Sequence, residues 1–236
     1  KLLTTFAALD LLGPAYQWTT EVYVNGPLQG EVVAGDLVLK GQGDPRMTLE
    51  NFWLLLRGLR ARGIREIRGD LVLDRSYFSA QEASAGDFDN EPTRPYNTPP
   101  DALLVNFKSV RLQFVPETEQ RRLAIITEPA LTQIQIQNNV VLDNEPGGDG
   151  LSRLKITALG DNASARLVFS GNYSAMCGEK DRNYSVLGHT QYVHGLFTLL
   201  WRELRGTFSG TLRDAETPAG AQRLFSYQTQ TLFEIV

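Results

Sequence analysis

The sequence predicts an α+β protein with more than one domain. Apolar helices are predicted at both ends of the chain, over residues 1–12 and 226–236. Between them, the pentapeptide "GDLVL" occurs twice with a helical pattern between the copies, which is typical of a βαβ unit. From residue 103 to about 168 short alternating segments dominate, and they predict an all-β module. The order helix, α/β, all-β, helix indicates that one segment is inserted into another.

The first helix is apolar almost all round. Leu2, Phe6 and Leu9 form one stripe of "KLLTTFAALDLL", and the sequence Gly13-Pro14 ends the helix. A helix this apolar is typical of a domain core, so we expect it to be buried. It starts without an N-cap residue, and we therefore expect the chain to be a fragment whose beginning is cut off.

The βαβ unit follows a predicted strand over residues 18–26. The copies of "GDLVL" span residues 35–39 and 69–73, and the helix between them has Thr48 as its N-cap and ends at Gly63. We expect the two copies to form neighbouring parallel strands joined by a right-handed crossover.

The second half of the chain returns to mixed structure after the all-β segment. Residues 79–101 are rich in Pro and acidic residues and predict a long loop. Residues 183–188 and 208–214 predict strands. Between these strands a helix is predicted with its inward residues at Val193, Leu196, Phe197, Leu200 and Leu204. Because both ends are open apolar helices, we expect residues 1–24 and 183–236 to share one domain.

Charge and composition exclude several classes of function. The chain of 236 residues has a net charge of −4 and no run of Lys or Arg, which argues against a nucleic-acid or anionic-membrane partner. No stretch approaches the roughly 20 apolar residues of a transmembrane helix. Cys177 is the single cysteine, so no internal disulfide or cysteine-based metal site is expected, and no cofactor is indicated.

Most motif matches in the chain have structural explanations. His189 and His194 are five residues apart and do not share a helix face, so we interpret both as structural. The stretch "GQGDP" is interpreted as a turn. Ser152 and Lys155 match S-x-x-K, in which a Lys takes the proton of a nucleophilic Ser one helical turn away. They lie in an alternating, strand-like stretch that would point them to opposite faces, so this match is predicted to be a decoy.

Lys1 differs from these matches because it opens an apolar helix. That is where the Lys of a functional S-x-x-K stands, one turn after the Ser. The nucleophile would then precede the first residue of this chain.

At these motifs the chain resembles the class C low-molecular-mass penicillin-binding proteins, serine peptidase family S13. These are D-alanyl-D-alanine carboxypeptidases and endopeptidases of the bacterial envelope. The resemblance covers essentially the whole chain and rests on five stretches in order, "KLLTTFAALDLLGPAYQWTTEVY", "GDLVLKGQGDPRMT", "IRGDLVLDRSYF", "YNTPPDALLVNFKSV" and "QTQTLFEIV".

The resemblance implies a nested domain arrangement. Residues 1–24 and 183–236 would be parts of the penicillin-binding, transpeptidase/β-lactamase-like domain. An α/β domain II over residues 25–104 and 166–182 would interrupt it, and an all-β domain III over residues 105–165 would be inserted into domain II.

The resemblance also implies a mechanism and a location. Lys1 would be the general base for the nucleophilic Ser, which attacks a peptidoglycan stem peptide and forms an acyl-enzyme; β-lactams would acylate the same Ser. That Ser and the S-x-N and K-T-G motifs lie outside the chain, so the fragment alone is expected to be inactive. Glu91 would bind the free amine of a diaminopimelate side chain. The location would be the periplasm or another extracytoplasmic part of the envelope, and no cofactor is implied.

Two other interpretations differ in class from a serine carboxypeptidase or endopeptidase. A non-catalytic envelope scaffold or peptidoglycan-binding module with a degenerate site would share the same fold. A class A β-lactamase is disfavoured because its S-D-N motif should follow within a single domain, without room for such insertions.

Overall fold

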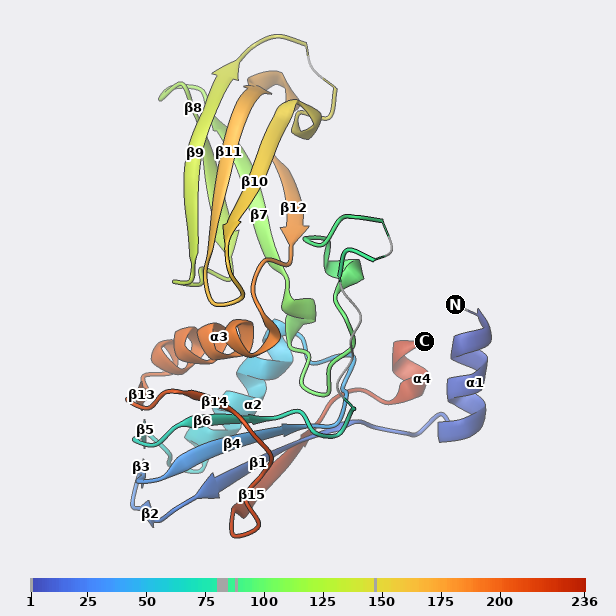
Figure 1. The fold of residues 1–236 in the computed structure, drawn as a ribbon, viewed down its shortest axis with the longest axis vertical. Helices are drawn as coiled ribbons and strands as arrows, with labels where there is room; N and C mark the ends of the chain where they lie inside the picture. Colours follow the sequence, from blue (N-terminus) through green and yellow to red (C-terminus); the bar gives the residue numbers. More distant parts are fainter. Residues whose placement is uncertain (1, 80–84, 88, 147) are drawn as a thin grey trace. The chain divides into compact units, whose positions relative to one another are not determined.

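The computed structural model describes residues 2–79, 85–87, 89–146 and 148–236. The chain forms two compact units (Figure 1). Unit 1 is drawn from residues 1–83, 99–106 and 200–236, and unit 2 from residues 84–98 and 107–199. The fold is therefore a mixed α+β fold in which segments distant in sequence share a unit, and the nested domain boundaries stay a prediction.

The main sheet of unit 1 has five strands within the described residues. Their order is β14-β6-β4-β1-β15. Strands β4, β6 and β14 run parallel, whereas β1 is antiparallel to both β4 and β15. The bounds are β1 Thr19–Asn25, β4 Asp36–Gly41, β6 Leu71–Asp74, β14 Leu212–Asp214 and β15 Gln222–Gln228.

A smaller sheet of unit 1 lies in the order β13-β5-β3-β2. Its strands are two residues long, and Val33 of β3 and Ile67 of β5 are fully buried. The bounds are β2 Leu28–Gln29, β3 Val32–Val33, β5 Glu66–Ile67 and β13 Thr207–Phe208.

The two copies of "GDLVL" are parallel neighbours in register, as predicted. Leu37 pairs with Leu71 and Leu39 with Leu73, and every side chain from Leu71 to Leu73 is buried. The connecting helix α2 (Leu49–Ala61) begins where predicted, because the Thr48 hydroxyl accepts a hydrogen bond from the Asn51 amide at 3.4 Å. Its apolar stripe is fully buried at Phe52, Leu55, Leu56 and Leu59.

The glycine that opens each copy allows the backbones to approach closely. The Gly69 amide donates to the Gly35 carbonyl at 3.1 Å, and a Cβ on Gly69 would lie 2.4 Å from the Gly35 carbonyl carbon. Gly210 repeats this contact before β14, where a Cβ would lie 1.9 Å from the Gly69 oxygen. A side chain does not fit at these positions, so glycine is required for steric reasons rather than for its backbone angles.

The aspartates that follow these glycines connect the strand starts. Asp36 Oδ1 accepts from the Asp70 amide at 2.8 Å, and Asp70 Oδ1 accepts from the Thr211 amide at 2.8 Å. Each carboxylate therefore satisfies a backbone donor at the entrance of the next strand. The segment "GTLRD" thus forms a third, divergent copy of the pattern.

The terminal helices of unit 1 differ from the sequence prediction. Helix α1 (Leu2–Leu12) forms as expected but contains no buried residue, so the expectation of a buried first helix is wrong for the described chain. Leu2, Leu3, Phe6 and Leu11 are exposed. The predicted helix over residues 226–236 is also wrong at its start. Residues 226–228 end strand β15, because they pair with β1, and α4 (Leu232–Ile235) begins only after the capping box of Thr231 and Glu234.

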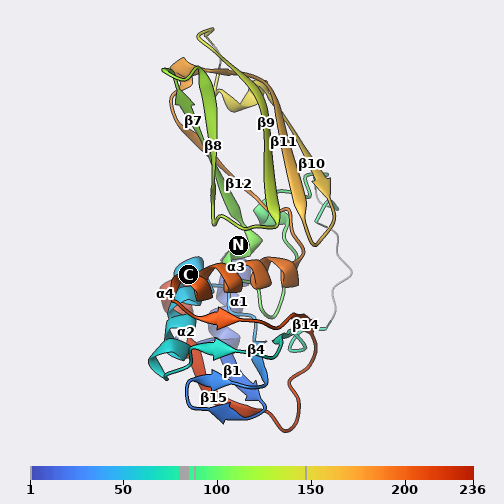
Figure 2. The same cartoon turned by 90° about the vertical axis from the view of Figure 1, so that its left-hand side faces the viewer.

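Unit 2 is dominated by strands, and residues 103–168, which were predicted to be rich in short strands, contribute most of them. Two three-stranded sheets are present within its described residues, in the orders β12-β7-β8 and β10-β11-β9 (Figure 2). Phe114 and Phe169 contribute one ring from each sheet to the core, with ring centroids 5.6 Å apart. The bounds are β7 Val110–Glu117, β8 Arg122–Glu128, β9 Ile134–Asp143, β10 Leu154–Gly160, β11 Ala165–Ser174 and β12 Lys180–Tyr184.

Helix α3 (His189–Glu203) spans the division between the two units in the sequence. Four of its predicted inward residues are buried, namely Val193, Leu196, Phe197 and Leu200. The fifth, Leu204, lies beyond the end of the helix. The strand predicted over residues 183–188 is displaced, because β12 covers Lys180–Tyr184 and pairs with β7.

Candidate functional site

The predicted general base, Lys1, lies outside the described residues. The helix that follows it presents large apolar side chains to solvent. Leu2 is 90% exposed, Leu3 80% and Phe6 67%. The described part of α1 is therefore an apolar surface.

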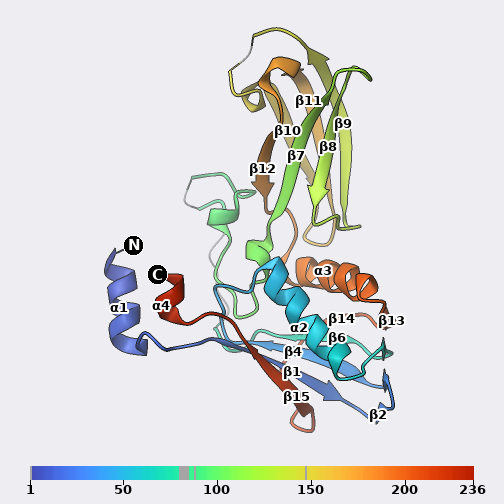
Figure 3. The ribbon, with the colours of Figure 1, turned by 180° about the vertical axis from the view of Figure 1, so that it is seen from behind.

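Helix α4 is fixed to the segment that leaves α1. The Leu232 amide donates to the Tyr16 carbonyl at 2.8 Å, and the Phe233 amide donates to the Pro14 carbonyl at 3.0 Å. Both helices belong to unit 1, and they lie side by side at one end of it (Figure 3). The Gln17 side chain also donates to the Thr229 carbonyl, although more than 200 residues separate them. The fold thus places the two ends of the described chain together.

The "GQGDP" segment is hydrogen-bonded to the segment that precedes α4. Asp44 is only 3% exposed, and it accepts hydrogen bonds from the Thr229 hydroxyl and the Arg46 amide. Burial raises the pKa of Asp44, while these hydrogen bonds oppose the shift. The segment is a turn, as the sequence predicts, and it joins β4 to the segment before α4.

Glu91 lies on a turn of unit 2 that Asp89 organises. The Asp89 carboxylate accepts from the Tyr96 hydroxyl at 2.7 Å, from the Asn97 side chain at 2.6 Å and from the Glu91 amide at 2.9 Å. The Tyr96 hydrogen bond is the main reason that the pKa of Asp89 lies below its usual value. Although Asp89 is exposed, its carboxylate links the Glu91 amide to Tyr96 and Asn97 and so fixes the Glu91 backbone.

The Glu91 side chain is accessible but paired. It is 52% exposed, and one of its oxygens accepts from Arg94 Nε at 3.3 Å. The i, i+3 spacing of this pair is visible in "EPTR". Because an exposed ion pair of this kind is weak, a ligand cation could compete with Arg94 for Glu91.

Tyr184 lies buried at the end of β12, next to the segment that carries Glu91. The Ser185 amide donates to the Thr93 carbonyl at 2.8 Å, which joins the two segments. Within the described residues the Tyr184 hydroxyl has no hydrogen-bond partner, and burial raises its pKa. Asp89 and Arg94 were not predicted as site residues, although they flank Glu91 in the sequence. Tyr184 is distant in sequence and was not predicted either.

The remaining motif residues form no catalytic group. Ser152 lies in a 3₁₀ turn (Leu151–Arg153) and Lys155 on β10, so this S-x-x-K match has no α-helix to bring the two together. His189 and His194 both lie on α3, and burial lowers the pKa of His194. In the part of the chain that the structure describes, no cluster of His, Cys, Asp and Glu side chains is arranged to hold a metal.

No helix among the described residues is long and apolar enough to cross a membrane.

Known proteins resemble the chain in sequence. A D-alanyl-D-alanine carboxypeptidase, DacB, of Haemophilus influenzae is 31% identical over 140 residues, which are 59% of this chain and 29% of that protein. A D-alanyl-D-alanine carboxypeptidase of Actinomadura sp. strain R39 is 37% identical over 83 residues, 34% of this chain and 15% of that protein.

Solved structures agree with the fold. The crystal structure of penicillin-binding protein 4 (DacB) of Haemophilus influenzae superimposes with a TM-score of 0.78 at 23% identity, over 99% of this chain and 51% of that one. The same protein in complex with a β-lactam gives 0.69 at 20% identity, over 99% and 48%. The chain therefore spans about half the length of these structures. A family model matches residues 1–236 throughout, and the chain belongs to the D-Ala-D-Ala carboxypeptidase 3 (S13) family.

Proposed function

We propose that the whole protein is a serine-type D-alanyl-D-alanine carboxypeptidase that acts on peptidoglycan stem peptides outside the cytoplasm. The observation that carries the proposal is the family match over all 236 residues. It is supported by relatives that are named as D-alanyl-D-alanine carboxypeptidases and by a neighbouring structure in complex with a β-lactam.

The proposed reaction has two steps. The hydroxyl of a Ser outside residues 1–236 attacks the carbonyl of the penultimate D-Ala, and the neutral amine of Lys1 takes its proton. The C–N bond breaks, the terminal D-Ala leaves after accepting a proton, and an ester to the Ser remains. Water then hydrolyses this ester. A β-lactam acylates the same Ser by opening its ring, and it stays attached because its leaving group is not released.

The corner of α1 and α4 supports this assignment of Lys1. The backbone hydrogen bonds from α4 to the segment after α1 join the two helices that, in the proposed arrangement, lead to the catalytic motifs. The nested arrangement, with the α/β and all-β segments inserted between them, agrees with two compact units that are each discontinuous in sequence.

The test compares the whole protein with the 236-residue chain. The whole protein should release D-Ala from a D-Ala-D-Ala-terminated stem peptide and should be labelled covalently by a fluorescent penicillin. The isolated chain should show neither reaction, because the nucleophile is absent from it. If the whole protein binds peptidoglycan but shows neither release nor labelling, the alternative of a non-catalytic envelope module is correct.

Glu91 is proposed to bind the free amine of a diaminopimelate side chain. Its exposed carboxylate and the fixed turn around Asp89 support this role. In the whole protein, Glu91→Gln should slow cleavage of diaminopimelate peptides more than it slows acylation by a simple penicillin. Glu119→Gln, which removes an exposed carboxylate elsewhere in unit 2, is the matched control. Equal losses in the two reactions would refute the role of Glu91.

A further inference from the structure

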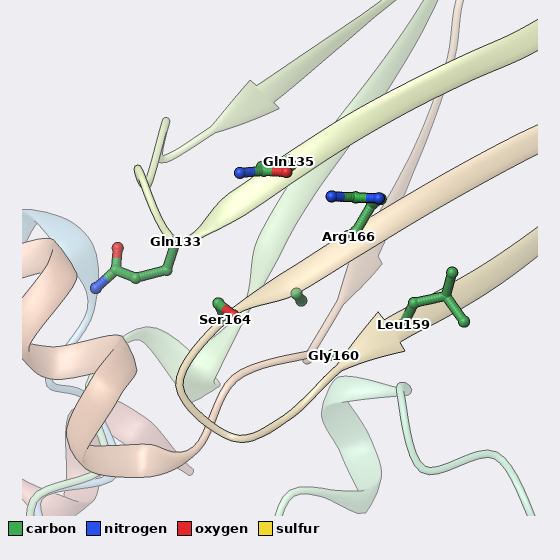
Figure 4. A pocket seen from close by; sticks show the side chains of 7 residues that line it. Gln133, Gln135, Leu159, Gly160, Ser164 and Arg166 are labelled. Atoms are coloured by element: carbon green, nitrogen blue, oxygen red, sulfur yellow. The ribbon is translucent and has the colours of Figure 1, made fainter.

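A pocket of about 250 Å³ lies within unit 2, at one end of the sheet β10-β11-β9 (Figure 4). Its walls come from the start of β9 and the residue before it, the end of β10, the turn that joins β10 to β11, and the start of β11. The lining residues are Gln133, Gln135, Leu159, Gly160, Ser164, Ala165 and Arg166. This volume is below the range of about 300–1,000 Å³ that is usual for sites of drug-sized ligands, so it suits a small group.

Strand register brings three of these side chains together. Arg166 on β11 is paired with Gln135 on β9 and with Leu159 on β10. Cross-strand partners share one face of a sheet, and this row faces away from the core that contains Phe169. Figure 4 shows the three side chains on adjacent strands, with Ser164 at the turn beside them. A guanidinium, an amide, a hydroxyl and a leucine side chain therefore surround one hollow.

The polar side chains of this row have no partner among the residues that the structure describes. The Arg166 and Gln135 side chains form no hydrogen bond or ion pair with any residue that the structure describes, and the Ser164 hydroxyl forms none either. Gln133 differs, because its amide donates to the Gln191 carbonyl at 3.3 Å and is held against α3.

The acidic group nearest in sequence is engaged elsewhere. Asp161, in the turn between β10 and β11, accepts hydrogen bonds from the amides of Ala163 at 2.8 Å and Ser164 at 2.9 Å. Its carboxylate therefore organises the turn and forms no ion pair with Arg166. The pocket lining contains one cation and no acid.

We propose that this pocket binds a carboxylate group, with Arg166 as its counter-ion. The guanidinium offers a planar pair of N–H donors that matches the two oxygens of a carboxylate. The Gln135 amide and the Ser164 hydroxyl provide further donors, and Leu159 provides an apolar wall for a small alkyl group next to the carboxylate. A peptide that ends in a small residue and a sugar acid both present this chemistry.

The experiment uses the 236-residue chain and needs no catalytic activity, so its outcome is independent of the proposed function. Isothermal titration with N-acetyl-D-alanine should give a dissociation constant in the millimolar range, as expected for so small a ligand. The corresponding C-terminal amide, which lacks the charge, should bind about tenfold more weakly or not at all. N-acetylmuramic acid tests a sugar acid as the alternative source of the carboxylate.

Arg166→Gln should reduce the affinity for the acid about tenfold, because it removes the counter-ion while keeping a side chain of similar size. Arg111→Gln is the matched control, since Arg111 is an exposed arginine on β7 that lies outside the pocket, and it should leave binding unchanged. Three results would overturn the proposal: equal binding of acid and amide, equal losses in the two variants, or no binding of either acid up to about 20 mM.

Discussion

Asp44 and Thr229 are 185 residues apart in the chain, yet the Thr229 hydroxyl lies 2.8 and 2.9 Å from the two Asp44 carboxylate oxygens. The contact joins the turn after β4 to the segment between β15 and α4. Asp44 is 3% exposed and Thr229 7%, so the carboxylate lies among protein atoms rather than in water. The cost of burying its charge exceeds the benefit of its hydrogen bonds, and the pKa of Asp44 is raised.

Asp44→Asn should therefore stabilise unit 1 at neutral pH. Because the pKa of Asp44 is higher in the folded than in the unfolded state, the folded chain binds more protons between these two pKa values. The free energy of unfolding therefore falls as pH rises from the unfolded to the folded pKa. The Asn variant removes this fall while keeping an acceptor oxygen. Urea denaturation at pH 4 and pH 7, followed by tryptophan fluorescence, measures the effect, because Trp18, Trp53 and Trp201 all lie in unit 1. A variant that loses stability at pH 7 would contradict the argument.

Asp74 should have the opposite pH dependence. Its side chain is 1% exposed, and it accepts hydrogen bonds from the amides of Ser76 at 3.0 Å and Thr217 at 2.8 Å as well as from both hydroxyls. Burial raises the pKa, but these hydrogen bonds outweigh it, and the net pKa is lowered.

The stability that Asp74 contributes is therefore present above the unfolded pKa and is lost as pH falls through the folded value. Asp74→Ala should lower the free energy of unfolding by about 2–4 kcal/mol at pH 7, because it leaves buried donors unpaired. The loss should shrink in acid, below the folded pKa. An unchanged loss at pH 3 and pH 7 would show that the carboxylate charge is not involved.

Gly69→Ala should destabilise unit 1 by about 1–3 kcal/mol or more, since the new methyl group would lie 2.4 Å from the Gly35 backbone. The strands that start at these glycines are in the centre of the sheet and cannot move apart without losing their ladder. Gly220→Ala is the matched control, because nothing lies within 4 Å of the position that its Cβ would take. Equal denaturation midpoints for the two variants would disprove the close-approach explanation.

Elements that depend on local sequence patterns were predicted correctly, whereas elements that depend on pairing with distant segments were not. The repeated "GDLVL" and the Thr48 cap are local, and they predicted the parallel pair β4 and β6 and the start of α2 correctly. Residues 226–228 were wrongly assigned to a helix. They belong to β15, which forms through pairing with β1, about 200 residues earlier in the chain, and a local pattern does not show this pairing. The second glycine contact, at Gly210, was missed because only the glycine and the leucine of "GDLVL" recur there.

The candidate site shows the same division. Glu91 was chosen from a family resemblance. Asp89 and Tyr184 lie near it through contacts that no periodic pattern in the sequence predicts. The pocket around Arg166 needs the register of three strands, β9, β10 and β11, and sequence alternation does not supply register. Sites that are assembled by the register of several strands are therefore not predictable from alternation alone.

Lys1 is proposed to be the general base. To accept a proton from the Ser, its amine must be neutral, although a free Lys side chain has a pKa of about 10.4. Lys1→Ala in the whole protein should slow acylation by a fluorescent penicillin about 10²–10⁴-fold, the usual contribution of general-base catalysis. Lys1→Arg should be nearly as damaging, because a guanidinium does not give up its proton at working pH.

Lys155→Ala is the control for Lys1. Lys155 belongs to the other S-x-x-K match, whose Ser152 lies in a 3₁₀ turn rather than on an α-helix, so its loss should leave the acylation rate unchanged. Thermal denaturation of each variant separates a catalytic defect from a folding defect. If Lys1→Ala folds normally and is acylated at a near-normal rate, another group takes the proton of the Ser, and the assignment of Lys1 is wrong.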